Sequence, residues 1–196
     1  MLKTEKIKII IGLGNPGEEY SNTPHNIGKN FINWFFDFIV ENKLGSKTLK
    51  WKKNKSVMGD VASLEIGGVK LILAIPTGFM NLSGLTALKL INFYGVDPKQ
   101  VIVVHDDTDL VAGNFKITYG CSSAGHKGIE STISNLKTQS FWRLKIGVRP
   151  DNLNQSLYRI KAGDFVIKKM SIKNKKIIEN RFDDIYVELS KWIKDN

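Results

Sequence analysis

The sequence IIGLGNPGEEYSNTPHN, residues 10–26, joins an apolar run to a loop that is rich in glycine, proline and polar residues. The run, Ile7–Ile11, is apolar nearly throughout, which is typical of a strand covered on both faces. After the loop, apolar residues recur at helical spacing up to about Val40. In α/β proteins, a polar loop at the end of such a strand is a usual place for a functional site. The loop carries His25, so we expect part of a site here.

Strands and helices alternate along the rest of the chain. Apolar runs predict strands over residues 101–104, 114–119 and 142–148, and a hairpin of strands 61–66 and 69–75 joined by Gly67-Gly68. Helical spacing predicts helices over residues 85–94, 129–136 and, as one long tail helix, about 172–194. The polar segment 151–161 is expected to be irregular. This order predicts an α/β fold with one domain over residues 1–196 and a mixed, mostly parallel twisted sheet flanked by helices.

The charge balance favours a polyanionic partner. The chain has 29 Lys and Arg residues against 19 Asp and Glu, a formal net charge of +10, which fits nucleic acid first and an anionic membrane second. A lysine-rich solvated surface is the alternative. The basic run at residues 47–55 likewise fits either a solvated connection or a phosphate-facing edge.

A cytoplasmic location is expected from three features. The single cysteine, Cys121, excludes an intrachain disulfide, the N-terminus shows no signal-peptide pattern, and no apolar run has the length of a membrane span.

The glycines of GLGNPG, residues 12–17, match a dinucleotide-binding fingerprint directly after a strand. Three details argue against that function. Prolines at 16 and 24 prevent the helix from starting inside the glycine turn, and Glu18-Glu19 would place negative charge where a pyrophosphate should bind. The acidic residue expected about 20 positions later would fall within the predicted helix that follows.

Metal and thiol chemistry are also disfavoured by spacing. Three histidines and Asp106 could suggest zinc, but no H-E-x-x-H pattern is present and Cys121 has no second cysteine beside it. Cys121 lies five residues before His126, which could suggest a thiol nucleophile, but this spacing does not establish nucleophile–base geometry and an ordinary small loop residue is the better explanation.

Polar residues after strands remain as the candidate site. His25 titrates near neutral pH and could act as a general base. Asp106 follows a buried-looking strand, where a carboxylate needs a partner, and an imidazole N–H would be a suitable one. Asn15 and Asn81 each offer an amide donor and acceptor, which suits a substrate that is itself an amide backbone.

Six motifs in this order resemble those of bacterial-type peptidyl-tRNA hydrolases. They are Gly12-Leu13-Gly14-Asn15-Pro16-Gly17, Glu19-Tyr20, Thr23-x-His25-Asn26, Phe79-Met80-Asn81-Leu82-Ser83-Gly84, His105-Asp106-Asp107-x-Asp109-Leu110 and Gly125-His126-x-Gly128. The resemblance runs from about Lys8 to Val166. It implies a phosphorylase/hydrolase-like fold, action as a monomer, and metal-free cleavage of the ester between a peptide and the 3′ ribose of tRNA, with no cofactor.

The resemblance also implies residue roles. His25 would activate the attacking water, Asp106 would orient and polarise His25, and Asn15 and Asn81 would hold the peptide backbone. Near the tRNA, the implied contacts are Tyr20 and Phe79 at the terminal adenosine, and Lys116 with Arg143 at the 5′ phosphate.

Four positions depart from the family pattern. Lys127 stands where the family usually has Asn, so it could stabilise an oxyanion, contact substrate or mark a slower enzyme. Pro24 replaces the usual Arg, Gly78 the usual Thr, and Ile167-Lys168-Lys169 a typical Gly-Lys or Gly-Arg. The alternative to an active hydrolase is therefore a catalytically weakened relative that binds tRNA or other RNA.

Overall fold

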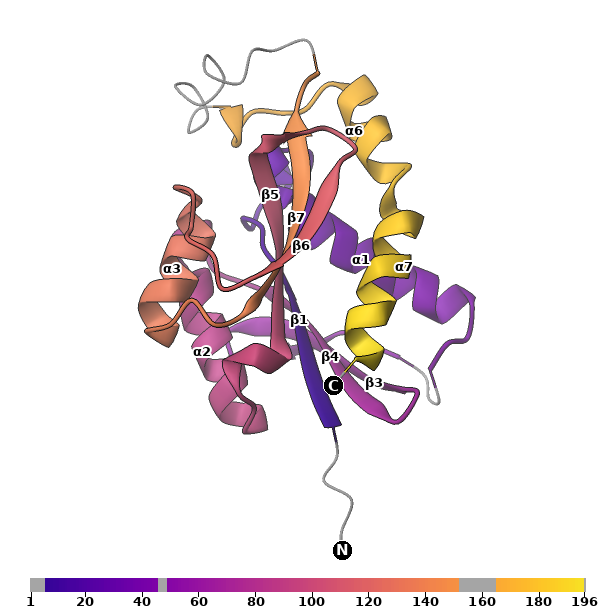
Figure 1. Ribbon diagram of the computed structural model, residues 1–196, viewed down its shortest axis with the longest axis vertical. Coiled ribbons are helices and arrows are strands. Elements are labelled where there is room, and N and C mark those ends of the chain that lie inside the picture. The colour runs from indigo at the N-terminus through magenta and orange to yellow at the C-terminus, as the bar shows by residue number, and fades with distance from the viewer. Residues whose placement is uncertain (1–5, 46–48, 152–164, 196) are drawn as a thin grey trace, which may run out of the picture.

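The computed structural model describes residues 6–45, 49–151 and 165–195, and these build one sheet with helices on both faces (Figure 1). Within the described residues the sheet has seven strands in the order β2-β3-β4-β1-β5-β7-β6. The strands are β1 (Lys6–Gly12), β2 (Lys52–Asn54), β3 (Gly59–Ile66), β4 (Val69–Pro76), β5 (Val101–Val111), β6 (Phe115–Tyr119) and β7 (Trp142–Arg149). The central pairs β4–β1, β1–β5 and β5–β7 are parallel, and the outer pairs are antiparallel. The structure thus confirms the mixed α/β sheet.

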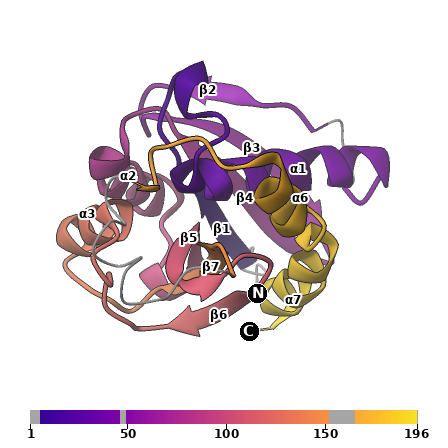
Figure 2. The same ribbon diagram turned by 90° about the horizontal axis from the view of Figure 1, so that it is seen from above.

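Helices cover the two faces in separate groups, as Figures 1 and 2 show. The helices are α1 (Ile27–Glu41), α2 (Ser83–Tyr94), α3 (Lys127–Leu136), α6 (Ile172–Glu179) and α7 (Phe182–Lys194). One core cluster includes Ile10 with the apolar stripes of α1 and α7, and the other includes Ile9 and Ile11 with residues of α2 and α3. This alternation along β1 is the period-2 pattern of a strand buried on both faces. No helix among the described residues has the length and apolarity needed to cross a membrane.

Three elements differ from the sequence-based predictions. β2 (Lys52–Asn54) lies in the basic run 47–55, for which no strand was predicted. β5 continues through His105–Asp109 to Val111, with an irregular register between Asp107 and Val111, so Asp106 lies on a strand and not in a loop after it. The prediction of a single tail helix was also wrong. α6 ends at Glu179, and the N–H of its cap residue Asn180 donates to Lys176 O and Ile178 O. α7 then starts with its own apolar stripe facing the sheet. The expected irregular segment, 151–161, lies outside the described residues apart from Asp151.

The start of α1 packs directly on the ends of two strands. A Cβ added at Gly28 would lie 2.2 Å from Val104 O and 2.9 Å from both N and O of Leu13. These are backbone atoms of the sheet and of the chain that leaves it, so they cannot move aside cheaply. Gly28 therefore fixes how closely the loop before α1, which carries His25, approaches β5.

Replacing Gly28 with Ala is expected to lower the free energy of unfolding by about 3 kcal/mol, because overpacking against backbone outweighs the better helix propensity of Ala. Urea denaturation measures the change. Gly45→Ala is the matched control, since an added Cβ there would meet only the Leu64 side chain, at 3.4 Å or more. Equal stability of the two variants would contradict the close packing of α1.

Candidate active site

A cavity of about 490 Å³ lies where the carboxyl ends of the central strands meet the loops that follow them. Residues far apart in the sequence line it. The lining consists of Asn15, His25, Phe79, Met80, Asn81, His105, Asp106, Asp107, Thr108, Asp109, Ser123, Ala124, Gly125, His126, Lys127, Lys145, Val166 and Ile167. The structure thus brings together the four polar residues predicted to form the centre of the site, Asn15, His25, Asn81 and Asp106.

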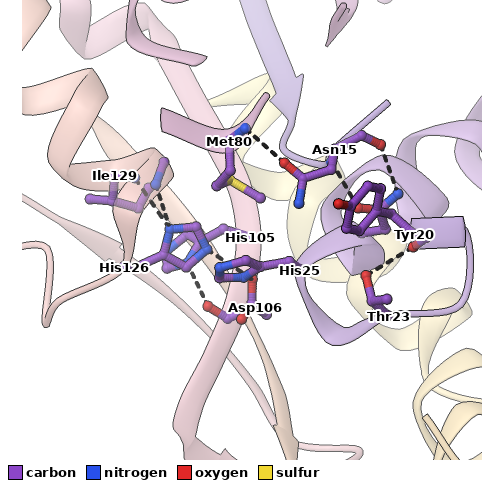
Figure 3. Close-up of polar contacts among 11 residues, drawn as sticks. Asn15, Tyr20, Thr23, His25, Met80, His105, Asp106, His126 and Ile129 are labelled. Atoms are coloured by element: carbon purple, nitrogen blue, oxygen red, sulfur yellow. Dashed lines mark hydrogen bonds and ion pairs between the residues drawn. The ribbon is translucent and has the colours of Figure 1, made fainter. Parts of the chain in front are cut away.

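One carboxylate oxygen organises the cavity wall. Oδ1 of Asp106 lies 2.9 Å from Nδ1 of His25 and 2.8 Å from Nε2 of His126 (Figure 3). Asp106 is only 2% exposed, so its charge depends on these two donors. His25 lies on the 3₁₀ turn η2 (Pro24–Asn26), and its backbone N–H donates to Val166 O at 3.0 Å. With Nδ1 donating to Asp106, the Nε2 atom of His25 is left to act as a base.

The second imidazole is held in one tautomer. Nδ1 of His126 accepts from the backbone N–H groups of Gly128 at 3.1 Å and Ile129 at 3.3 Å, which caps the N-terminus of α3. Because Nδ1 accepts, the proton of neutral His126 must be on Nε2, where it is donated to Asp106. His126 therefore joins the cap of a helix to the carboxylate of the site.

Protonation in this cluster is set by burial and by Asp106 together. Burial by itself would lower the pKa of His25, but the charge and hydrogen bond of Asp106 outweigh it and raise that pKa above its usual value. Burial would raise the pKa of Asp106, but the two imidazoles that face it hold its pKa well below the usual range. The wall is thus a carboxylate beside a histidine with strengthened basicity.

His105 supports the cluster from behind. Its Nδ1 donates to the backbone O of Asp106 at 2.7 Å, and its ring meets that of His126 edge-on at 4.7 Å. Burial first, and then the neighbouring His126, hold the pKa of His105 well below the usual range, so this ring is neutral. From the sequence, His105 and His126 were considered only for the disfavoured zinc site, and His126 also beside Cys121. Neither was expected to contact Asp106. A histidine directly before an amphipathic helix could have indicated the cap, but not its bond to Asp106.

The amide of Asn15 is fixed by the chain around it. Its Oδ1 accepts from Met80 N at 2.8 Å, and its backbone N and O exchange hydrogen bonds with the Asn26 side chain. No protein group in the described part of the chain accepts from Asn15 Nδ2, so this donor is available to a ligand. Asn81, which follows Met80, is exposed at the cavity. The two amides thus differ: one is held rigidly by its oxygen, and the other is accessible to solvent.

Two aromatic rings stand near this amide pair. Tyr20 and Phe79 meet edge-on with centroids 6.4 Å apart, and Phe79 is 53% exposed although it lines the cavity. An exposed ring beside a cavity offers a face on which a planar ligand can stack.

The basic pair expected from the sequence is not brought together at the surface. Lys116 is exposed, but Arg143 is fully buried, with its guanidinium 4.2 Å above the Phe141 ring and Nη1 donating to Phe141 O. A tRNA phosphate cannot reach Arg143 there, so this expected contact is not supported. The cross-strand neighbour of Lys116 is instead Lys145, which lines the cavity and pairs with Asp107 at 3.1 Å.

The remaining sequence candidates are placed as follows. Lys127 lines the cavity, but its Nζ pairs with Glu130 Oε2 at 3.0 Å. Cys121 is not part of the cavity lining, and its Sγ lies 3.3 Å from Thr118 Oγ1. The glycine-rich loop does not form a dinucleotide fingerprint, because α1 begins only at Ile27.

The imidazoles and the carboxylate also have the composition of a metal site. The ligand atoms of His25, Asp106 and His126 lie within 4.8 Å of one another. In the structure those atoms are used in hydrogen bonds to each other, and His126 Nδ1 is occupied by the helix cap. Metal-free action remains a prediction.

Comparison with known proteins decides the family. Residues 9–196 match the family model described as peptidyl-tRNA hydrolase. The chain belongs to the peptidyl-tRNA hydrolase family. It is 42% identical over 144 residues to a peptidyl-tRNA hydrolase of Alkaliphilus metalliredigens, covering 73% of each chain. It is 39% identical over 178 residues to one of Mycoplasma capricolum, covering 91% of this chain and 88% of the relative.

The fold agrees with this assignment. The crystal structure of peptidyl-tRNA hydrolase from Acinetobacter baumannii superposes with a TM-score of 0.77 at 24% identity, covering 93% of this chain and 86% of that one. The resemblance noted in the sequence is thereby confirmed at the level of family and fold.

Exchange of His126 for Asn should separate its two contacts. Asn also caps helices, so the free energy of unfolding should change by less than the loss of about 1 kcal/mol expected for His126→Ala. The shorter side chain leaves Asp106 to His25 alone, so the pKa of His25 should rise further, which NMR titration of the His25 ring measures. An unchanged pKa in His126→Asn would show that the shared oxygen does not tune His25.

Proposed function

We propose that this member of the peptidyl-tRNA hydrolase family cleaves the ester between a peptide and the 3′ ribose of tRNA, with His25 as the general base. The observation that carries the proposal is the His25–Asp106 hydrogen bond of 2.9 Å at the wall of an open cavity. A base oriented by a buried carboxylate is the arrangement that ester hydrolysis by activated water requires.

The reaction follows from the free nitrogen of His25. Nε2 takes a proton from water as the oxygen attacks the ester carbonyl, and the charge of Asp106 stabilises the imidazolium that forms. The C–O bond to the ribose then breaks, and His25 returns the proton to the departing 3′ oxygen. Each proton taken is thus given back, and the products are a free peptide acid and tRNA.

The two amides supply recognition of the peptide part. Asn15 Nδ2 would donate to a peptide carbonyl, while Asn81 can both donate and accept. An aminoacyl-tRNA without a peptide bond cannot satisfy both amides, so it would bind less well. Contacts with backbone alone also explain action on peptides of different sequence.

The tRNA part would be held by rings and cations. Tyr20 and Phe79 would contact the terminal adenosine by stacking. Lys116, which is exposed on β6, would contact a tRNA phosphate, while its cross-strand neighbour Lys145 stays paired with Asp107. The net charge of +10 strengthens binding to a polyanion at long range.

Metal-free action, action as a monomer and a cytoplasmic location belong to the same proposal. The pairing of His25, Asp106 and His126 supports the first, since hydrogen bonds satisfy the cluster. The substrate, a product of translation, supports the last. The complete His25–Asp106 pair argues against the alternative of a catalytically weakened RNA-binding relative.

Purified protein is expected to hydrolyse an N-acetyl-aminoacyl-tRNA in the presence of EDTA and to spare the unblocked aminoacyl-tRNA. Release of labelled N-acetyl amino acid measures both activities. Loss of activity in EDTA, restored by a divalent metal, would contradict the metal-free proposal. Tight tRNA binding without turnover would support the RNA-binding alternative.

His25→Ala is expected to reduce kcat about a thousandfold, because the proton of the attacking water then has no acceptor. The Kd for deacylated tRNA should stay within about twofold, since the ring does not contribute charge to phosphate binding. In the wild type, catalysis needs neutral His25, whose pKa is raised. The rate should therefore increase with pH through a midpoint above the ordinary 6.5 of histidine. A midpoint below 6.5, or a minor loss in His25→Ala, would remove His25 as the base.

A further inference from the structure

Lys127 makes a contact that the proposed reaction does not explain. It lines the cavity that holds His25 and Asp106, yet its Nζ lies 3.0 Å from Oε2 of Glu130, one turn further along α3. The two side chains are 69% and 56% exposed. An exposed pair of this kind contributes about 0–1 kcal/mol, so another anion can displace Glu130 at little cost.

Apart from the exposed pair with Glu130, the local structure disfavours a cation at this position. Lys127 is the first residue of α3, where the positive end of the helix disfavours a cation by about 0.3–1 kcal/mol. The backbone N–H groups of Gly128 and Ile129 already donate to His126 Nδ1. These two amides are therefore not available to an anion, and the Lys127 side chain is the charged donor that remains at this helix end.

Of the two lysines in the cavity lining, Lys127 is the one free to change partner. Lys145 pairs with Asp107, and these side chains are only 17% and 9% exposed. Removing one partner of a largely buried pair leaves an uncompensated charge and costs far more than displacing an exposed one. The Lys127 ammonium also stands on a flexible four-carbon stem with rotatable donors.

We propose that Lys127 leaves Glu130 when substrate binds and pairs with the phosphodiester on the 5′ side of the terminal nucleotide of the tRNA. This inference rests on the proposed function. The reacting ester is carried by the ribose of that nucleotide, so its 5′ phosphate is the anion nearest to the reacting carbon. With the ester at His25, a phosphate one ribose away would lie in or beside the same cavity, which Lys127 also lines. Glu130 competes for the ammonium and repels the phosphate, so it weakens binding.

The test compares Lys127→Gln, Glu130→Gln and the double variant. KM and kcat for N-acetyl-aminoacyl-tRNA and the Kd of deacylated tRNA are measured at several salt concentrations. Lys127→Gln should raise KM and Kd about fivefold, the equivalent of one exposed ion pair, and leave kcat within about twofold. The slope of log Kd against log salt should fall by about 0.7, the value for one phosphate on a single strand. Glu130→Gln should lower KM, and less so in the Lys127→Gln background.

Lys191→Gln is the matched control, since Lys191 forms a similarly exposed pair with Glu188 on α7. It should leave the salt slope of tRNA binding unchanged. A fall in kcat with unchanged KM in Lys127→Gln would overturn the proposal and assign Lys127 to the transition state. If the Lys127 and Glu130 variants match the wild type in Kd and in the salt slope of tRNA binding, Lys127 and Glu130 form only a solvated ion pair and the proposal is wrong. If the wild type itself hydrolyses nothing, the proposed function fails, while the Kd series still decides whether Lys127 binds phosphate.

Discussion

The shared Oδ1 of Asp106 is the contact on which the site depends. A carboxylate that is 2% exposed must be compensated, and two imidazoles compensate it from different segments of the chain. His25 lies on the turn before α1, and Gly28 lets the start of α1 pack against the strand ends. His126 lies at the N-terminus of α3 and caps it. The oxygen therefore joins helices that cover opposite faces of the sheet. Losing Asp106 would remove both a catalytic partner and this link.

The two histidines that share the oxygen have unequal freedom. His126 has both ring nitrogens engaged, one by the α3 amides and one by Asp106, so these contacts fix its tautomer. His25, which lines the cavity, has Nδ1 engaged by Asp106, whereas its Nε2 has no hydrogen-bond partner among the described residues. The proposed proton transfer therefore falls to His25, while His126 limits how much of the charge of Asp106 acts on it. His105, neutral and fully enclosed, keeps the ring of His126 in place.

The sequence predicted the His25–Asp106 part of this arrangement, and its failures have structural causes. Both residues follow strongly apolar runs, which located them at the carboxyl edge of the central sheet, although β5 continues through Asp106 where a loop was predicted. Arg143 and Lys145 are two residues apart on β7, so alternation puts them on the same face and cannot distinguish them. The pairing with β5 distinguishes them. Arg143 is opposite Val103, on the α3 side of the core, whereas Lys145 is opposite His105, two residues nearer the cavity end of the strand. Whether a side chain on this face of β7 is buried depends on its distance from the end of the strand. The local alternation of apolar and polar residues does not give that distance.

The helix cap formed by His126 also affects whether His25, Asp106 and His126 could bind a metal ion. A metal on Nε2 of neutral His126 would force the proton onto Nδ1, where it would meet the N–H groups of Gly128 and Ile129. Metal ligands of this type normally have an acceptor at the other nitrogen, and His126 has two donors there. Binding would therefore break the start of α3 as well as the bond to Asp106. The composition of the cluster is that of a metal site, but its hydrogen-bond directions are those of an acid–base pair with a structural third member.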